Sequence, residues 1–436
     1  MSDRDHDDCE GCGEYRELSR RGFVAASAAA AAGAWVTPLF PAWLPKVVLA
    51  ESARADRDII VSVFLRGGCD GLTLCVPFLD PDYYAGRSTI AVPRPDSTDP
   101  NRGFALDDAF AFPPAMRALL PAYDAGDLLV VHATGSIDPS RSHFDAQRFM
   151  EVGKPRDTSV NTGWLGRHLA STTPLRSDAP LRAVGISSGL PKTLVGAPRA
   201  LPIPNPAAFA IGGSLTTRDA RAAWLQDDYG LSAEPIRSAA LDAIATIELL
   251  GMIDFDAYRP AGGAVYPDTG FGRGLRSAAA LIKSDVGVEA AQIDRGGWDT
   301  HSGQDPLAGS MYNTMLDLAG ALGAFHADVI GSGTSQNVTV VVLSEFGRNA
   351  RENGSAGTDH GRGNVMFAMG RHIQGGRVLV KDWPGLAREN LERGQDLAVT
   401  LDHRDVLAEI VYNRLGNPNL ETVFPDFTPT FRGVTT

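Results

Sequence analysis

The chain has 436 residues, of which 44% are hydrophobic and 21% are charged, as is typical of a globular protein with a large core. Its formal net charge of -12 at pH 7 argues against a nucleic-acid-binding protein, because such proteins carry a basic surface that neutralises phosphates. The charge does not exclude a small anionic substrate, because a bound metal ion reverses the field around it.

The N-terminal segment, residues 1–55, has the features of a twin-arginine signal peptide followed by a linker. Arg20 and Arg21 stand in the sequence SRRGF, and an alanine-rich apolar stretch covers residues 23–35. That stretch is shorter than the roughly 20 residues needed to span a bilayer. We therefore expect export through the twin-arginine machinery, to the periplasm, the cell envelope or the medium, with no transmembrane span in the mature chain. An ordinary N-terminal helix is the alternative.

Cysteine usage adds little to this prediction. Cys9 and Cys12 precede the paired arginines and are expected to be lost with the signal. Cys69 and Cys75 remain in the exported chain, where an oxidising compartment would allow a disulfide. We expect instead that both are apolar residues packed beside a strand.

From residue 58 onward, short apolar runs alternate with helical patterns. Continuous apolar runs of this length are typical of strands that are buried on both faces, as in a parallel sheet. The predicted strands are 58–65, 127–134, 181–188, 286–293, 337–344 and 364–370.

The helical patterns lie between and after these strands. Apolar residues recur at spacings of three and four between 307 and 325, segment 217–255 has the pattern of a helical insertion, and 403–416 is a closing helix. Strand and helix alternation predicts a three-layer α/β/α sandwich with a mostly parallel central sheet. We expect a single domain over residues 56–436, with a helical insertion at about 215–285.

Ligands of such a fold bind beyond the carboxyl ends of the strands, and polar residues gather there in this sequence. Four strand-linked loops bring carboxylates and imidazoles to this edge, and a fifth brings hydroxyls. In chain order these residues are Asp70, then Ser140, Ser142, His143 and Asp145, then Asp294, Asp299 and His301, then Glu345, and finally Asp359 and His360.

Carboxylate oxygens and imidazole nitrogens together form sites for first-row divalent metals such as zinc, manganese or iron. Two such ions can clamp a phosphoryl or sulfuryl group and activate an oxygen nucleophile. Each residue also has a structural interpretation: Asp70 could cap a turn, Glu345 could pair with Arg348, and His301 could orient a helix. Their occurrence at successive strand ends favours the metal site.

The chain resembles a mostly twin-arginine-exported bacterial family that is defined by a domain of unknown function. The resemblance lies in the segments LRGGCDGL, RSHFDAQ, GGWDTH, VVLSEFGR and GTDHGRGN, which are spread over nearly all of residues 58–416. That family is similar to the alkaline phosphatase and sulfatase superfamily, which includes phosphatases, phosphodiesterases, sulfatases and mutases. The resemblance implies an alkaline-phosphatase-like fold.

The resemblance also implies which residues bind metal. Many superfamily members end a strand in an acid, a histidine and a glycine, whereas the strand at 337–344 ends in Glu345 and Phe346. Phe346 thus stands where a histidine ligand is usual, which leaves a site for one ion or none. GTDHGRGN is similar to the later superfamily loop that supplies the final metal ligand. His360 is therefore expected to bind the metal, and Asp359 is expected to lie next to the ligands without binding the metal itself. The candidate ligands are Asp70, Asp299, His301, Glu345 and His360, with zinc or manganese as the expected ion.

The superfamily nucleophile lies at a helix start after the second strand, where helix-end N–H groups favour an anion. PSRSHF matches that place, so Ser142 is the candidate nucleophile and His143 its partner or a ligand. Ile137 occupies the position of the modified cysteine of sulfatases, which disfavours a formylglycine mechanism. The alternative role of Ser142 is the N-cap of the following helix.

Three functions remain open on the sequence. The first is a metal-dependent hydrolase of phosphate or sulfate esters. The second is a catalytically degenerate relative that binds an anionic glycan or a lipid head group, and the third is an assembly protein of the cell envelope. Fold alone does not separate them.

Overall fold

The computed structural model describes residues 57–334 and 336–436. The predicted export signal, with the two cysteines inside it, lies outside the described residues. Among the helices in the described ranges, none combines the length and the hydropathy needed to cross a membrane.

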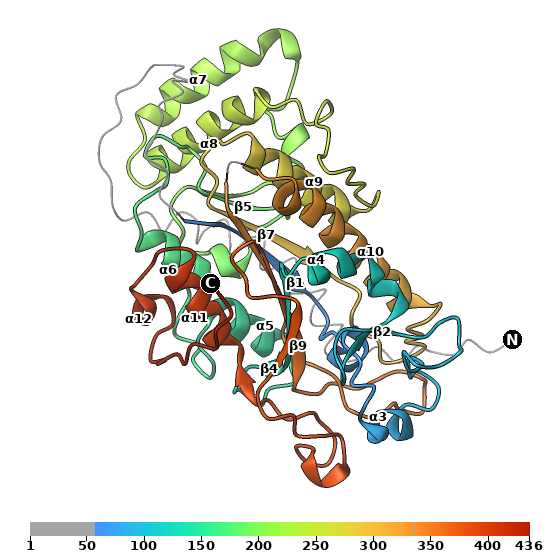
Figure 1. Ribbon diagram of the computed structural model, residues 1–436. Coiled ribbons are helices and arrows are strands. Elements are labelled where there is room, and N and C mark those ends of the chain that lie inside the picture. The colour runs from blue at the N-terminus through green and yellow to red at the C-terminus, as the bar shows by residue number, and fades with distance from the viewer. Residues whose placement is uncertain (1–56, 335) are drawn as a thin grey trace, which may run out of the picture.

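A nine-stranded mixed sheet forms the centre of the described chain (Figure 1). The strand order is β10-β4-β9-β8-β1-β7-β5-β6, and β11 pairs with β4 at one side. The strands are β1 (Ile59–Leu65), β4 (Leu128–Gly135), β5 (Ala183–Gly185), β6 (Ala200–Pro202), β7 (Ala290–Arg295), β8 (Val338–Ser344), β9 (Asn364–Met369), β10 (Arg377–Val380) and β11 (Leu401–Asp402). A separate two-stranded hairpin joins β2 (Phe104–Ala105) to β3 (Ala111–Phe112).

The prediction of a mostly parallel sheet is confirmed, with one strand reversed. β1 is parallel to both of its neighbours, β7 and β8. β9 runs antiparallel to β4 and to β8. A strand that is buried on both faces has the same apolar composition in either direction, so the sequence did not reveal this reversal.

Helices cover both faces of the sheet because successive side chains of a strand point to opposite sides. In β1, Val61 and Val63 pack in one cluster with residues of α9 and α10, whereas Ile60 and Phe64 pack in another with residues of α6 and α11. Figure 1 shows α9 and α10 on one side of the strands and α6 and α11 on the other. The helices are α2 (Gly71–Leu74), α3 (Pro81–Gly86), α4 (Leu120–Asp124), α5 (His143–Val152), α6 (Trp164–Ala170), α7 (Arg218–Gly230), α8 (Ile236–Gly251), α9 (Gly270–Lys283), α10 (Ser310–Phe325), α11 (His403–Asn413) and α12 (Leu420–Val423).

The segment predicted as a helical insertion contains α7, α8 and α9. α7 and α8 form a helical pair at one end of the molecule (Figure 1). α9 differs from them, because its residues Leu275, Ala278 and Leu281 are buried in the cluster beneath the sheet. α9 therefore belongs to one of the layers that enclose the sheet.

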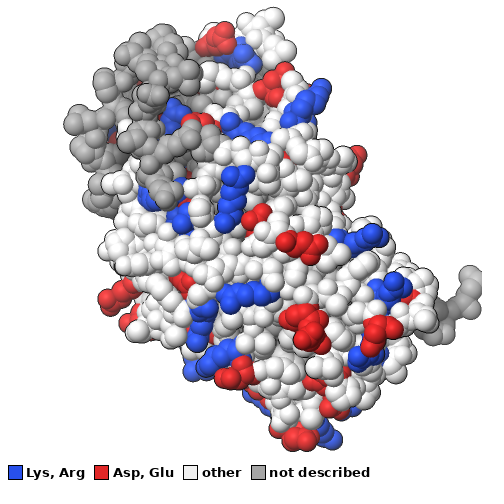
Figure 2. Space-filling model, viewed as in Figure 1, with Lys and Arg blue, Asp and Glu red and all other residues white. Residues whose placement is uncertain are grey.

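Cys69 and Cys75 are both buried free thiols, so they act as apolar residues beside β1 and form no disulfide with each other. Charged side chains of both signs are intermixed over the described part of the face in Figure 2, and no broad basic patch appears there.

Candidate metal centre

The candidate site lies at the edge of the sheet where β1, β4, β7 and β8 end. These four strands point the same way, so the loops that follow them meet at one edge. β9 is antiparallel to its neighbours, and the loop that precedes it therefore reaches the same edge. This reversal explains why His360, which comes before a strand, can meet residues that come after strands.

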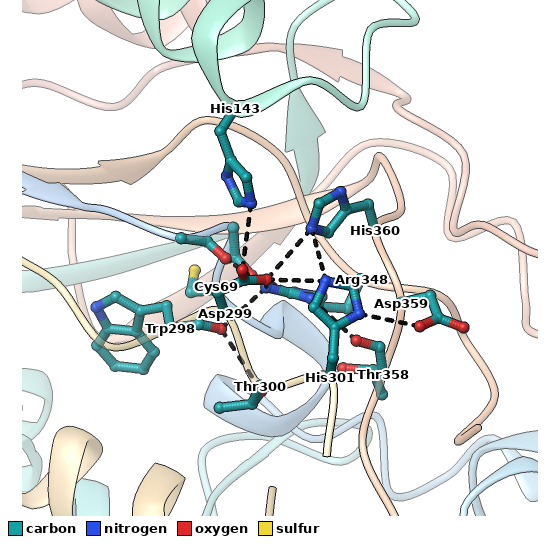
Figure 3. A network of polar contacts seen from close by, with 12 residues as sticks. Cys69, His143, Trp298, Asp299, Thr300, His301, Arg348, Thr358, Asp359 and His360 are labelled. Atoms are coloured by element: carbon teal, nitrogen blue, oxygen red, sulfur yellow. Dashed lines mark hydrogen bonds and ion pairs between the residues drawn. The ribbon is translucent and has the colours of Figure 1, made fainter. Parts of the chain in front are cut away.

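Three histidines surround the carboxylate of Asp299 (Figure 3). The Nε2 atoms of His301 and His360 lie 3.0 and 3.2 Å from Asp299 Oδ1. The Nε2 atom of His143 lies 3.6 Å from Asp299 Oδ2. These side chains come from α5, from the loop after β7 and from the loop before β9, so the fold brings them together from three distant segments.

The Nδ1 atom of each histidine, on the side of the ring away from Asp299, contacts an oxygen atom of another residue. Because every Nδ1 atom is engaged, every Nε2 atom is directed toward Asp299, which is the arrangement that metal-binding histidines adopt in proteins. The outer partners are the Glu345 carboxylate for His143 (2.8 Å), the Asp359 carboxylate for His301 (3.0 Å) and the Arg141 carbonyl for His360 (2.9 Å).

The residues present fit a divalent ion. One ligand atom from each of His143, Asp299 and His360 lies within 4.8 Å of the others. Nε2 of His143 is buried and has no hydrogen-bond partner. Buried polar atoms normally have one, so this nitrogen is suited to bind a ligand at the centre. Nε2 of His301 lies 2.9 Å from Nε2 of His360, which places a third nitrogen beside these three ligand atoms. Nitrogen and carboxylate donors in this number suit a transition ion.

The electrostatics of the centre show how tightly the acid and the imidazoles are coupled. Burial would raise the pKa of Asp299, but the three histidines hold this pKa far below its usual range. Burial lowers the pKa of His143, yet the attraction of Asp299 and the hydrogen bond with Glu345 outweigh burial and raise the pKa to about 9. Burial keeps the pKa of His360 below its usual value. A cation at the centre would replace the proton that His143 otherwise holds.

Glu345 does not point at the centre of the cluster. Its fully buried carboxylate accepts hydrogen bonds from the Gly67 backbone N–H at 2.8 Å and from the Gln147 side chain at 3.0 Å, besides its contact with His143. The alternative that Glu345 pairs with Arg348 is not what the structure shows, because the Arg348 guanidinium contacts Asp299 instead. Glu345 thus orients a histidine, and the prediction that it is a metal ligand is not supported by this geometry.

Asp70 also lies apart from the three histidines. Its buried carboxylate pairs with the Arg87 guanidinium at 2.5 and 3.0 Å. The Thr73 hydroxyl and the Gln304 amide each donate to the same carboxylate at 2.7 Å. With these donors in place, the carboxylate has an internal structural role, and the structure does not bring Asp70 to the candidate metal centre.

Phe346 forms an apolar wall of the site. Its ring centroid lies 5.0 Å from that of His143 and 4.8 Å from that of His360. Gly68 packs against the same ring, and a Cβ atom there would lie 2.3 Å from it, while the backbone has φ +64. A glycine is therefore required at this point of the RGGCDG loop.

The predicted nucleophile region reaches the site through its backbone. The carbonyl of Arg141 contacts His360, and Ser142 and His143 follow it directly. Ser142 is exposed and occupies the N-cap position of α5, but its side chain makes no capping hydrogen bond. The hydroxyl of Ser142 therefore does not act as an N-cap acceptor in this structure. Ser140 is half-buried and lines a small pocket together with Ser136, Asp138, Ala146, Glu345, Phe346 and Arg362.

Fold and site together define a mixed α/β protein with a histidine- and aspartate-lined centre at the carboxyl edge of its sheet. The chain belongs to the family described as "Protein of unknown function (DUF1501)", whose model matches residues 57–415. A search of curated proteins found no match. Among solved structures, the alkaline phosphatase from the Antarctic bacterium TAB5 is similar at 13% identity and a TM-score of 0.28, over 74% of this chain and 95% of that chain. A likeness of this size does not establish function.

Proposed function

We propose that this protein is a metal-dependent hydrolase of phosphate or sulfate esters. The observation that carries the proposal is the convergence of three Nε2 atoms on Asp299. His143, His301, His360 and Asp299 would hold the ion, and zinc and manganese are the ions that suit these donors. Such an ion supplies Lewis-acid chemistry, which stabilises charge on an ester oxygen and lowers the pKa of a hydroxyl.

Ser142 is the proposed nucleophile. Its hydroxyl is exposed, is free of a capping bond, and follows the residue whose carbonyl touches His360. Its oxygen would bond to phosphorus or sulfur while the bond from that atom to the alcohol oxygen breaks, and the proton lost by the serine would leave with the alcohol. Water would then cleave the seryl ester and release the inorganic product.

Phe346 supports a second candidate function. An apolar ring that packs against two of the histidines limits the space for further ligands and for water. The alternative is therefore a relative that has lost its chemistry and uses the centre to bind an anionic glycan or a lipid head group at the cell envelope. We also propose that the helices on both faces of the sheet form the three-layer, alkaline-phosphatase-like architecture that the sequence motifs imply.

Turnover of an activated aryl ester by single serine variants tests the hydrolase proposal. Ser142→Ala should reduce turnover to background and leave the metal content unchanged, because the hydroxyl is not one of the proposed ligands. Ser140→Ala is the matched control and should keep most of the activity, because Ser140 stands in the preceding turn. The opposite pattern would move the nucleophile to Ser140.

Other outcomes separate the two candidate functions. Full activity in the double serine variant would exclude a serine nucleophile. A metal-loaded wild type that hydrolyses no phosphate monoester, phosphate diester or sulfate ester would contradict the hydrolase proposal and favour the binding function.

We also propose that the protein is exported through the twin-arginine pathway, on the basis of Arg20 and Arg21 before a short apolar stretch. Changing both arginines to lysine should leave the full-length precursor in the cytoplasm, as measured by fractionation and immunoblotting. A double Lys46→Arg and Arg54→Lys variant, with its changes outside the motif, should be exported normally. Efficient secretion of the twin-lysine variant would refute this route.

A further inference from the structure

Arg348 is a fully buried arginine whose guanidinium lies against Asp299 (Figure 3). The Nη2 atom donates to Asp299 Oδ1 at 2.6 Å, on the same oxygen that faces His301 and His360. A guanidinium stays positively charged at any pH at which the protein is folded. Asp299 therefore contacts a permanent cation in addition to the three imidazoles.

The same guanidinium links three site loops through backbone carbonyls. Its Nε atom donates to the carbonyl of Gly68 at 2.6 Å, and Nη2 also donates to the carbonyl of Gly67. The carbonyls of Trp298 at 3.1 Å and Thr358 at 2.9 Å accept from Nη2 and Nη1. These acceptors belong to the loop after β1, the loop that carries Asp299 and the loop that carries His360.

The backbone of Arg348 is also fixed to a ligand loop. Arg348 forms an antiparallel bridge with His360, and the neighbouring Asn349 N–H donates to the Asp359 carbonyl at 2.9 Å. The side chain and the main chain of one residue thus set the spacing between Asp299 and His360. A shift of either loop would break several of these hydrogen bonds at once.

We propose that Arg348 is a positioning residue that takes the place of a second metal ion beside Asp299 and so restricts the centre to one divalent ion. The inference rests on the metal centre of the proposed function. A guanidinium 2.6 Å from Oδ1 occupies that oxygen and repels a further cation, whereas Oδ2, which lies 3.6 Å from Nε2 of His143, would bind one ion together with the Nε2 atoms. Lysine cannot replace it, because an ammonium group lacks the planar fork of donors that reaches several carbonyls.

Isothermal titration of the metal-stripped protein with zinc or manganese tests the proposal. The wild type should bind one ion per chain at the centre. Arg348→Lys, which keeps the charge and loses the fork, should bind the same ion about 10- to 100-fold more weakly, as removal of groups that orient metal ligands commonly does. Arg87→Lys is the matched control, because Arg87 is equally buried but serves Asp70, and its dissociation constant should stay within about twofold of the wild type.

The outcomes separate this inference from the function on which it rests. A wild type that binds metal while Arg348→Lys binds it equally well would overturn the role of Arg348 alone, as would two ions per wild-type chain at the centre. A wild type that binds no ion would overturn both proposals. If Arg348→Lys does not fold, the stoichiometry of the wild type still decides, because the proposal requires one ion and excludes two.

Discussion

His360→Ala should lower the affinity of the protein for zinc or manganese by at least about 100-fold, because it removes a ligand and not only a group that orients one. His360 has its Nε2 atom 3.2 Å from Asp299 and 2.9 Å from the Nε2 atom of His301. Its removal leaves a gap in the middle of the donor set. In a thermal melt, the wild type should be stabilised by about 2.7 kcal/mol at an ion concentration 100 times the dissociation constant, and the variant should show little of this gain.

His326→Ala is the control for the loss of a buried histidine. His326 contacts Asp127 at 2.8 Å, just before β4 begins and therefore at the opposite edge of the sheet from the centre. This variant should lose stability but keep the wild-type response to metal. Equal responses of His360→Ala and of the wild type to metal and to chelator would contradict the proposed ligand set.

Asp70→Ala should lower the free energy of unfolding by about 3–5 kcal/mol, because it leaves the Arg87 guanidinium buried without its counter-charge. Both side chains are fully buried, so water cannot replace the lost carboxylate. Urea unfolding measures this loss. The variant should nevertheless gain as much stability from added metal as the wild type does, because Asp70 is not placed at the centre.

A control variant and a contradicting outcome complete this test. Asp96→Ala removes the partner of Arg94 in an exposed pair and should change stability only slightly, because water and salt screen such pairs. If Asp70→Ala instead unfolds like the wild type but no longer responds to metal, Asp70 is a ligand, as its place after β1 suggested.

Much of the fold was predictable from the sequence because its strands are continuous apolar runs. The runs that became β1, β4 and β8 have nearly the predicted bounds, since every residue in them is buried. The predicted strand at 181–188 shrinks to β5, and β10 was not predicted at all. The half-buried sequence RVLV of β10 is too short to give a periodic signal.

The site was predictable in part. The glycine-rich loops carrying Asp299, His301 and His360 were identified as ligand loops, and the structure brings these three residues together with His143. Asp70 and Glu345 follow strands in the same way, yet they face other protein groups.

The reason lies in contacts that no local pattern encodes. The partner of Asp70 is Arg87, which follows α3, and the partner of Glu345 is His143 at the start of α5. A carboxylate after a strand has the same sequence signature whether it meets an ion, an arginine or a histidine. The proposed role of Arg348 was hidden for the same reason, because the carbonyls of Gly68 and Trp298 that accept from it belong to loops far away in the chain.

Anomalous diffraction from crystals of the zinc- or manganese-loaded protein tests the central claim most directly. The proposed centre predicts one anomalous peak, about 2.0–2.2 Å from Nε2 of His143, His301 and His360 and from a carboxylate oxygen of Asp299. A saturated crystal with no peak among these residues, or with its peak at Asp70, would contradict it.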